Sequence, residues 1–113
     1  MLAALHLAPA AADDVLSDAA AKKLLNARSC NACHGIDEVR LGPSFRSVAL
    51  RYADAPASSY DWLAQKIIVG GAGSWGFVPM VSNPGVAPAE AQAIVEWIRT
   101  LSKSTPVSQG SHQ

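Results

Sequence analysis

The two cysteines of this 113-residue chain, Cys30 and Cys33, are separated by only two residues, and His34 follows them directly. Such close neighbours cannot join distant parts of a chain, so the sequence is not that of a disulfide scaffold. A chain of this length is expected to form one domain around one core. Phe, Tyr and Trp nevertheless supply only 6% of the residues. We therefore expect that something other than side chains helps to fill the core.

Composition excludes several classes of protein. Hydrophobic residues make up 50% of the chain and charged residues 16%, which excludes a disordered or highly charged tail protein. Nine Lys and Arg balance nine Asp and Glu, and this absence of net charge argues against nucleic-acid binding. No apolar run reaches the roughly 18–20 residues that a transmembrane span needs.

The two ends of the chain differ from its middle. Residues 1–12 are uncharged, end in Ala10-x-Ala12 and precede Asp13-Asp14, which is typical of the end of a secretory signal peptide, although the basic start is absent. We expect residues 1–12 to be a signal-peptide remnant or disordered. Residues 13–103 are the predicted domain, and residues 104–113 are the predicted disordered polar tail.

Hydrophobic residues recur at helical spacing in three segments, and a shorter fourth segment is compatible with a helix. Asp14 or Ser17 is the expected cap of the first helix, and Ser58 with Asp61 has capping-box spacing. Pro88 suits the first turn of the last helix. No segment alternates as a strand does, so the sequence predicts an all-α fold. The expected helices span residues 14–28, 44–52, 58–69 and 88–103.

Residues 70–88 are predicted to form a long loop. The segment holds five of the eight glycines and three of the seven prolines. Loops of this length in compact domains are usually functional or disordered. Trp75, Phe77 and Met80 make this one too apolar for disorder, which favours a function.

The Cys30-Asn31-Ala32-Cys33-His34 segment matches a site of covalent c-type haem attachment. Both thiols can add to vinyl groups on one edge of a porphyrin, and the turn then places the imidazole beneath the iron. A thioredoxin-like redox pair would need a βαβ context. A zinc site would need two more ligands, and the other histidines, His6 and His112, lie in the terminal segments. These alternatives and a chance occurrence stay open at this point.

Met80 is the candidate sixth ligand of such an iron, because it is the only Met besides the initiator and lies in the apolar loop directly after Pro79. The competing interpretation is a methionine that merely caps the core.

Together with the attachment motif, several further elements resemble a class I cytochrome c of the small bacterial monohaem kind, over roughly residues 20–103. These elements are Leu41-Gly42-Pro43, the Gly70–Met80 segment with Trp75, Asn83 and the helix that bears Trp97. The resemblance implies three to five helices wrapped around one covalently attached haem c. Members of this kind pass electrons to periplasmic nitrite reductase or terminal oxidases.

The resemblance also implies roles for single residues. The carbonyl of Pro43 would accept a hydrogen bond from the His34 imidazole, and Asn83 would donate one near the Met80 sulfur. The residues expected in the wall of the haem pocket or the core are Phe45, Tyr52, Trp62, Leu63 and Ile67.

Trp75 and Lys66 resemble groups that reach the haem propionates, and Arg46 and Arg51 are further candidates for that contact. Phe77 departs from the family, in which a proline precedes the Val-Pro-Met run, so the local backbone there is expected to differ.

The implied function is one-electron transfer between Fe(II) and Fe(III) iron, without catalysis, because His34 and Met80 would leave no open position on the metal. Partners would be other redox proteins, met transiently by a monomer. The absence of net charge and the apolar residues near Met80 and Ile36 predict hydrophobic rather than charge-steered docking. Thioether attachment in bacteria takes place outside the cytoplasm, so the expected location is the periplasm.

Three alternative functions are open on the sequence alone. The chain could be a haem c domain or subunit of a larger oxidoreductase complex, or a sensor in which a gas displaces Met80. The third alternative is a thiol protein without metal.

Overall fold

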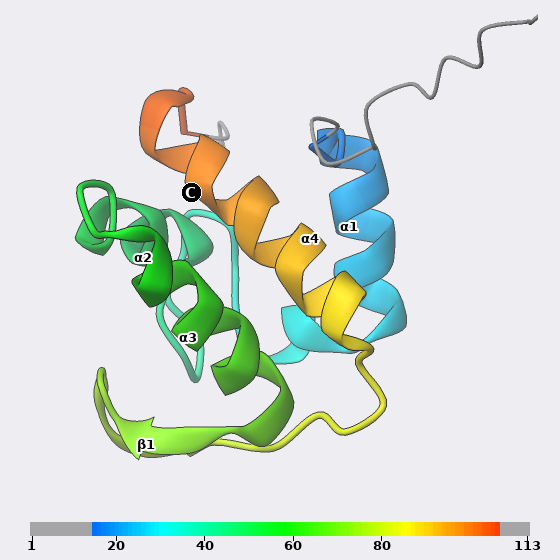
Figure 1. Ribbon diagram of the computed structural model, residues 1–113, viewed down its shortest axis with the longest axis vertical. Coiled ribbons are helices and arrows are strands. Elements are labelled where there is room, and N and C mark those ends of the chain that lie inside the picture. Colours follow the sequence, from blue (N-terminus) through cyan, green and yellow to red (C-terminus); the bar gives the residue numbers. More distant parts are fainter. Residues whose placement is uncertain (1–14, 107–113) are drawn as a thin grey trace, which may run out of the picture.

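The computed structural model describes residues 15–106, which form four α-helices and one small antiparallel sheet (Figure 1). The helical fold class predicted from the sequence is therefore confirmed. None of the helices in this part of the chain is long and apolar enough to cross a membrane. The predicted signal-peptide remnant, residues 1–12, lies outside the described residues. In chain order the elements are α1 (Asp18–Ala27), the 3-10 helix η2 (Cys30–Ala32), α2 (Phe45–Arg51), α3 (Ala57–Val69), β1 (Gly71–Gly73), β2 (Gly76–Met80), α4 (Pro88–Thr100) and the 3-10 helix η3 (Leu101–Lys103).

Helix α4 is the central element of the fold. It lies between α1 on one side and α2 and α3 on the other (Figure 1). Trp97 of α4 is only 1% exposed, and its indole N–H donates to the Asp18 carboxylate of α1 at 3.0 Å. The Trp97 ring also meets the ring of Phe45 edge to face, with 6.1 Å between centroids. One side chain thus joins three helices.

The helix starts follow local capping chemistry, with one exception. Ser17 Oγ accepts from the Ala20 N–H at 3.1 Å, so of the two expected caps of the first helix it is Ser17 that serves. The predicted capping box of α3 is wrong. Its N-cap is Pro56, which has extended backbone and makes no side-chain capping bond. Ser58 consequently lies inside the first turn of α3, so its hydroxyl is not at the N-cap position from which a side chain accepts from the free N–H groups of that turn.

The segment from residue 70 to residue 88 contains a β-hairpin where the sequence predicts only loop. Gly71 pairs with Met80 and Gly73 pairs with Gly76. Gly71, Gly73 and Gly76 have φ values of 136°, 108° and 110°, which residues other than glycine rarely adopt. Strands built this way carry no alternating pattern of polar and apolar residues, which explains why no strand was predicted here.

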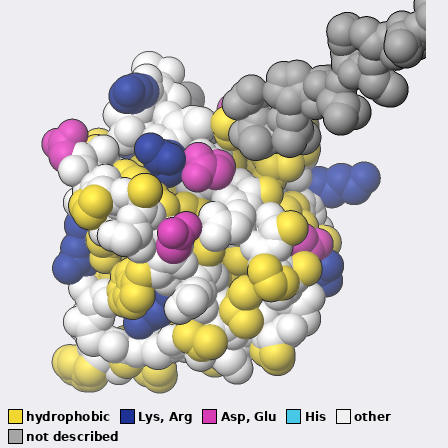
Figure 2. Space-filling model, viewed as in Figure 1, with side chains coloured by type: hydrophobic (Ala, Val, Ile, Leu, Met, Phe, Trp, Pro, Cys, Tyr) yellow, Lys and Arg dark blue, Asp and Glu magenta, His cyan; other side chains and the backbone are white. Residues whose placement is uncertain are grey.

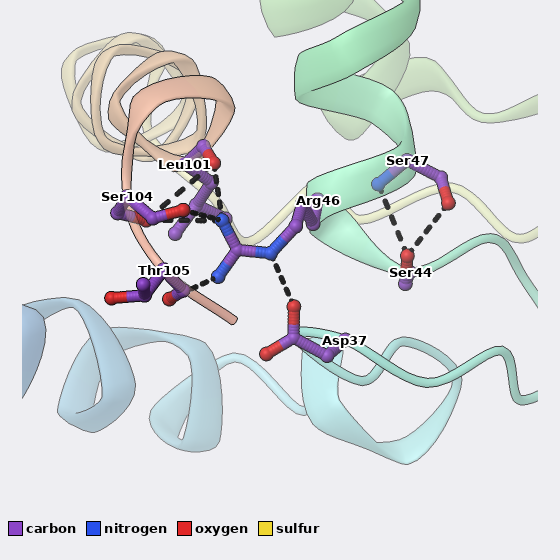
Figure 3. Close-up of polar contacts among 7 residues, drawn as sticks. All are labelled: Asp37, Ser44, Arg46, Ser47, Leu101, Ser104 and Thr105. Atoms are coloured by element: carbon purple, nitrogen blue, oxygen red, sulfur yellow. Dashed lines mark hydrogen bonds and ion pairs between the residues drawn. The ribbon is translucent and has the colours of Figure 1, made fainter. Parts of the chain in front are cut away.

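A partly buried arginine connects the loop after His34 with the end of the domain (Figure 3). Arg46 Nε contacts the Asp37 carboxylate, and Nη1 donates to the carbonyl oxygens of Leu101 and, at 2.8 Å, Ser104. Nη2 donates to the Thr105 carbonyl at 2.9 Å, and the Arg46 side chain is only 12% exposed. Ser104 and Thr105, which the sequence assigns to the polar tail, are part of this contact, whereas residues 107–113 of that tail lie outside the described residues.

Helix α4 is tied to α1 by an ion pair between residues far apart in sequence. Arg28 Nη2 donates to Glu90 Oε2 at 2.8 Å, and Glu90 Oε1 accepts from the Ala87 N–H at 3.0 Å. Hydrogen bonding to Arg28, more than any other effect, lowers the pKa of Glu90. A carboxylate with a lowered pKa stabilises the fold above its ordinary pKa and ceases to do so as the pH falls through the lowered value.

We expect Glu90→Gln to lower the free energy of unfolding at pH 7 and to lower it by a smaller amount at about pH 3, because the effect shrinks as the pH falls from the ordinary glutamate pKa of about 4.3 toward the lowered value. Glutamine keeps an oxygen for the Ala87 N–H and removes the charge that pairs with Arg28. Urea unfolding at the two pH values measures the difference. Glu96→Gln is the control, because Glu96 pairs with Arg99 on the same helix and joins no two helices. An equal effect in both variants would contradict the prediction.

Candidate cofactor site

All eight residues predicted for the site line one cavity of about 320 Å³, a volume within the usual range of cofactor pockets. They come from η2 and the loop after it, from α3, from the hairpin and from the segment that follows it. Ile94, Val95 and Ile98 of α4 add an apolar lining that the sequence predicted only as a helix stripe. The eight predicted residues are Cys30, Cys33, His34, Pro43, Lys66, Trp75, Met80 and Asn83.

The two thiols and the imidazole share one tight turn. Ser29 has a left-handed backbone with φ 62°, and the N–H groups of Cys33 and His34 both donate to the Cys30 carbonyl, at 3.1 and 3.0 Å. Both cysteines are free and partly exposed to the cavity. Burial raises the pKa of the Cys30 thiol, so at neutral pH this group is a protonated thiol. Two thiols so close together suit addition to two substituents on one edge of a flat ligand.

His34 is held in a single orientation. Its Nδ1 lies 2.7 Å from the Pro43 carbonyl oxygen, and the Gly42 N–H donates to the Cys33 carbonyl at 2.8 Å. The Phe45 ring stacks on the imidazole at 4.9 Å between centroids and 24° between planes. With Nδ1 donating to Pro43, Nε2 keeps its lone pair and can bind a metal.

Met80 is placed by the hairpin. It ends β2 opposite Gly71, and Gly70 at the end of α3 has a φ of 73°. A Cβ at Gly70 would lie 2.5 Å from the Met80 carbonyl oxygen, so only glycine lets the end of β2 pass α3 this closely. The thioether is a soft ligand of the kind that c-type iron uses.

Asn83 holds the segment after Met80 against the end of α3. Its N–H donates to the Ile68 carbonyl at 2.8 Å, and its Nδ2 donates to the carbonyl oxygens of Ile67 at 3.1 Å and Val81 at 3.4 Å. The two amide hydrogens are thereby used on backbone acceptors. This arrangement differs from the one the resemblance implies, in which Asn83 donates near the Met80 sulfur.

Trp75 and Lys66 lie at the cavity, and the two arginines offered as alternatives do not line it. Trp75 is 43% exposed, and Lys66 Nζ lies 5.2 Å from the centre of the Trp62 ring. The donors of Arg46 are taken by the carboxylate and carbonyl groups described above. Arg51 contacts the hairpin itself, a partnership that no spacing in the sequence indicates, because 23 residues separate it from Ser74. The five residues expected in the pocket wall or core, Phe45, Tyr52, Trp62, Leu63 and Ile67, all line the cavity.

The alternatives to haem find little support in the fold. No three His, Cys, Asp or Glu side chains gather into a metal site within residues 15–106, so a zinc site has no further ligands there. The sheet in the same part of the chain is a two-stranded antiparallel hairpin, which is not the βαβ context of a thioredoxin-like pair.

Comparison with known proteins decides among these interpretations. The family model described as cytochrome c matches residues 19–102. The chain belongs to the cytochrome c family. Cytochrome c-551 of Azotobacter vinelandii is 44% identical over 79 residues, which cover 70% of this chain and 94% of the relative. Cytochrome c-551 of Allochromatium vinosum is 35% identical over 98 residues, which cover 87% of this chain and 96% of the relative.

The fold agrees with the sequence comparison. The crystal structure of wild-type cytochrome c552 of Nitrosomonas europaea superimposes with a TM-score of 0.68 at 37% identity, covering 72% of this chain and 99% of that one. The resemblance to small class I bacterial cytochromes is therefore confirmed. The chain is a monohaem electron carrier rather than an enzyme, and Cys30 and Cys33 are the pair through which this family attaches haem c.

We expect Gly42→Ala to destabilise the holoprotein by about 1–3 kcal/mol, the usual cost of overpacking. A Cβ at this position would lie 2.6 Å from His34 Cε1, so the imidazole or the loop must move. Denaturant unfolding followed by haem absorbance measures the loss. Gly85→Ala is the matched control, since a Cβ there meets no atom within 4 Å. Equal stability of the two variants would show that His34 tolerates displacement.

Proposed function

We propose that this chain transfers single electrons through an iron bound between His34 Nε2 and the Met80 sulfur. The observation that carries the proposal is that both residues line one cavity with the two attachment thiols, although they come from the loop after η2 and the end of β2. Two axial protein ligands would leave no position for a substrate, which suits a carrier.

The residues around the ligands would adjust the iron's reduction potential. The Pro43 carbonyl accepts the Nδ1 hydrogen of His34 and so makes the imidazole more basic. A bound haem supplies the one-electron chemistry. The apolar side chains of α4 exclude water from the cavity and disfavour the extra positive charge of the oxidised state, and a thioether ligand likewise favours the reduced state. Trp75 and Lys66, which line the cavity, would meet the propionates.

Met80→Ala tests the ligand assignment. We expect the variant to lose the ferric sulfur–iron charge-transfer band, to bind carbon monoxide readily when reduced and to have a lower reduction potential, because the thioether stabilises ferrous iron. Absorption spectra in both redox states and a redox titration measure these changes.

Val81→Ala serves as the control, because Val81 also lines the cavity and has no ligating atom. It should keep the charge-transfer band. Rapid carbon monoxide binding by the unmodified reduced protein would overturn the proposal and favour a gas sensor.

The surface around the hairpin fits transient docking of a redox partner. No charged residue occurs between Lys66 and Glu90. Phe77 is 92% exposed, and Val78 and Val81 are 62% and 70% exposed. Hydrophobic side chains gather along the lower edge of the molecule, where Figure 1 places the hairpin (Figure 2). A partner would meet this face by apolar contact rather than by charge attraction.

The location and oligomeric state that we propose follow from the same chemistry. Thioether attachment in bacteria takes place outside the cytoplasm, which supports a periplasmic carrier. A carrier that serves more than one partner through a small contact is expected to be a monomer.

Phe77→Ser tests the docking face. We expect it to slow reduction of a purified periplasmic nitrite reductase about five- to thirtyfold, the effect of losing one aromatic anchor of roughly 1–2 kcal/mol. The second-order rate, measured by stopped flow, should vary little with added salt. Val15→Ser is the control, because Val15 is 44% exposed and precedes the start of α1, which lies on the opposite side of α4 from α3 (Figure 1). A rate that falls steeply with salt would contradict hydrophobic docking.

A further inference from the structure

The hairpin is held to the rest of the domain by few contacts. Its β1 residues are all exposed, and in β2 only Met80 is partly buried. At the end near α3, Gly70 and Asn83 hold the chain. The other end is the turn at Ser74 and Trp75, which projects away from α3 (Figure 1).

Arg51, the last residue of α2, contacts this turn in two ways. Its Nη1 donates to the Ser74 carbonyl at 2.6 Å, and its Cζ lies 4.4 Å from the centre of the Trp75 ring. Among the described residues this is the one side-chain hydrogen bond that reaches residues 71–80 from outside the hairpin. Arginine suits both contacts, because its guanidinium is planar, stacks on aromatic rings and carries several donors.

The charge of Arg51 is used on these contacts alone. No carboxylate within residues 15–106 forms an ion pair with it, although Arg28, Arg40, Arg46 and Arg99 each have one. An arginine paired with Asp or Glu would be drawn toward its partner. The Arg51 guanidinium instead lies close to the Trp75 ring and, at 5.8 Å, to the ring of its neighbour Tyr52.

The position of the turn bears on Met80 because one strand connects them. Strand β2 begins two residues after Ser74 and ends at Met80. The glycines at 71, 73 and 76 all have positive φ, and the pairing shifts register between Gly71 and Gly73. A hairpin rich in glycine resists displacement poorly, so an anchor at its turn limits how far its end can swing.

We propose that Arg51 is a positioning residue that fixes the hairpin turn and thereby keeps Met80 directed into the cavity. This inference rests on the proposed ligation of iron by Met80. Without Arg51 the hairpin would leave the cavity more readily, and an external ligand would replace the Met80 sulfur at lower concentration.

The test uses imidazole binding to the ferric holoprotein, followed by loss of the sulfur–iron charge-transfer band. We expect Arg51→Gln to bind imidazole about tenfold more tightly than the unmodified protein, the size of effect for losing one hydrogen bond and one cation–π contact. Arg51→Lys keeps the positive charge near Trp75 and loses the planar guanidinium, so its imidazole affinity should lie between those of Arg51→Gln and the unmodified protein.

Lys103→Gln is the control, because it removes one positive charge from an exposed residue of η3 that neither lines the cavity nor belongs to the hairpin. Its imidazole affinity should equal that of the unmodified protein. Urea unfolding of each variant separates displacement of Met80 from a general loss of stability.

Three outcomes distinguish the possibilities. Equal imidazole affinity in Arg51→Gln and the unmodified protein would overturn the positioning role while leaving Met80 ligation intact. A changed pH dependence of the reduction potential with unchanged imidazole affinity would also overturn it and would assign Arg51 to a propionate. Absence of the charge-transfer band from the unmodified protein would instead overturn the proposed Met80 ligation itself.

Discussion

The hydrogen bond between His34 Nδ1 and the Pro43 carbonyl is the constraint around which the site is organised. It closes a loop whose two sides are also joined by backbone hydrogen bonds, because the Gly42 N–H donates to the Cys33 carbonyl and the Phe45 N–H donates to the Gly35 carbonyl. The loop therefore fixes the imidazole and leads directly into α2, whose first residue, Phe45, stacks on that same ring. Displacing the imidazole would disturb both its hydrogen bond and the helix behind it.

The shortage of large side chains has its counterpart in the cavity. The buried core lies mainly where α4 meets α1, α2 and α3, and Trp97 is the largest side chain buried there. Ile94, Val95 and Ile98 of α4, none more than 7% exposed, belong to this core and also line the cavity, whose other apolar walls include the more exposed Trp75 and Val81. A covalently attached haem would cover this apolar surface. The two cysteines would thus attach a group that completes the core where large side chains are lacking.

Much of the site could be predicted from the sequence because its chemistry is local or rare. Cys30, Cys33 and His34 are adjacent, and Met80 is the only methionine within the domain. The hairpin could not be predicted, because glycines with positive φ leave no alternating pattern. The partners of Arg46, Arg51 and Asn83 depend on the packing of distant segments, which one sequence does not show. The start of α3 was predicted wrongly because Pro56, which has no capping side chain, occupies the N-cap position in place of Ser58.

The Arg46 side chain joins the loop after His34 to the turn that follows α4. Asp37 lies three residues after His34, whereas Leu101 and Thr105 follow the last helix. Terminal turns commonly fray independently of the structure that precedes them. Here one guanidinium binds both segments, so fraying of the C-terminal turn would also remove a contact that holds the loop after His34. Backbone amides at the end of α4 should therefore exchange hydrogen with solvent in the same cooperative opening as those around residues 35–37.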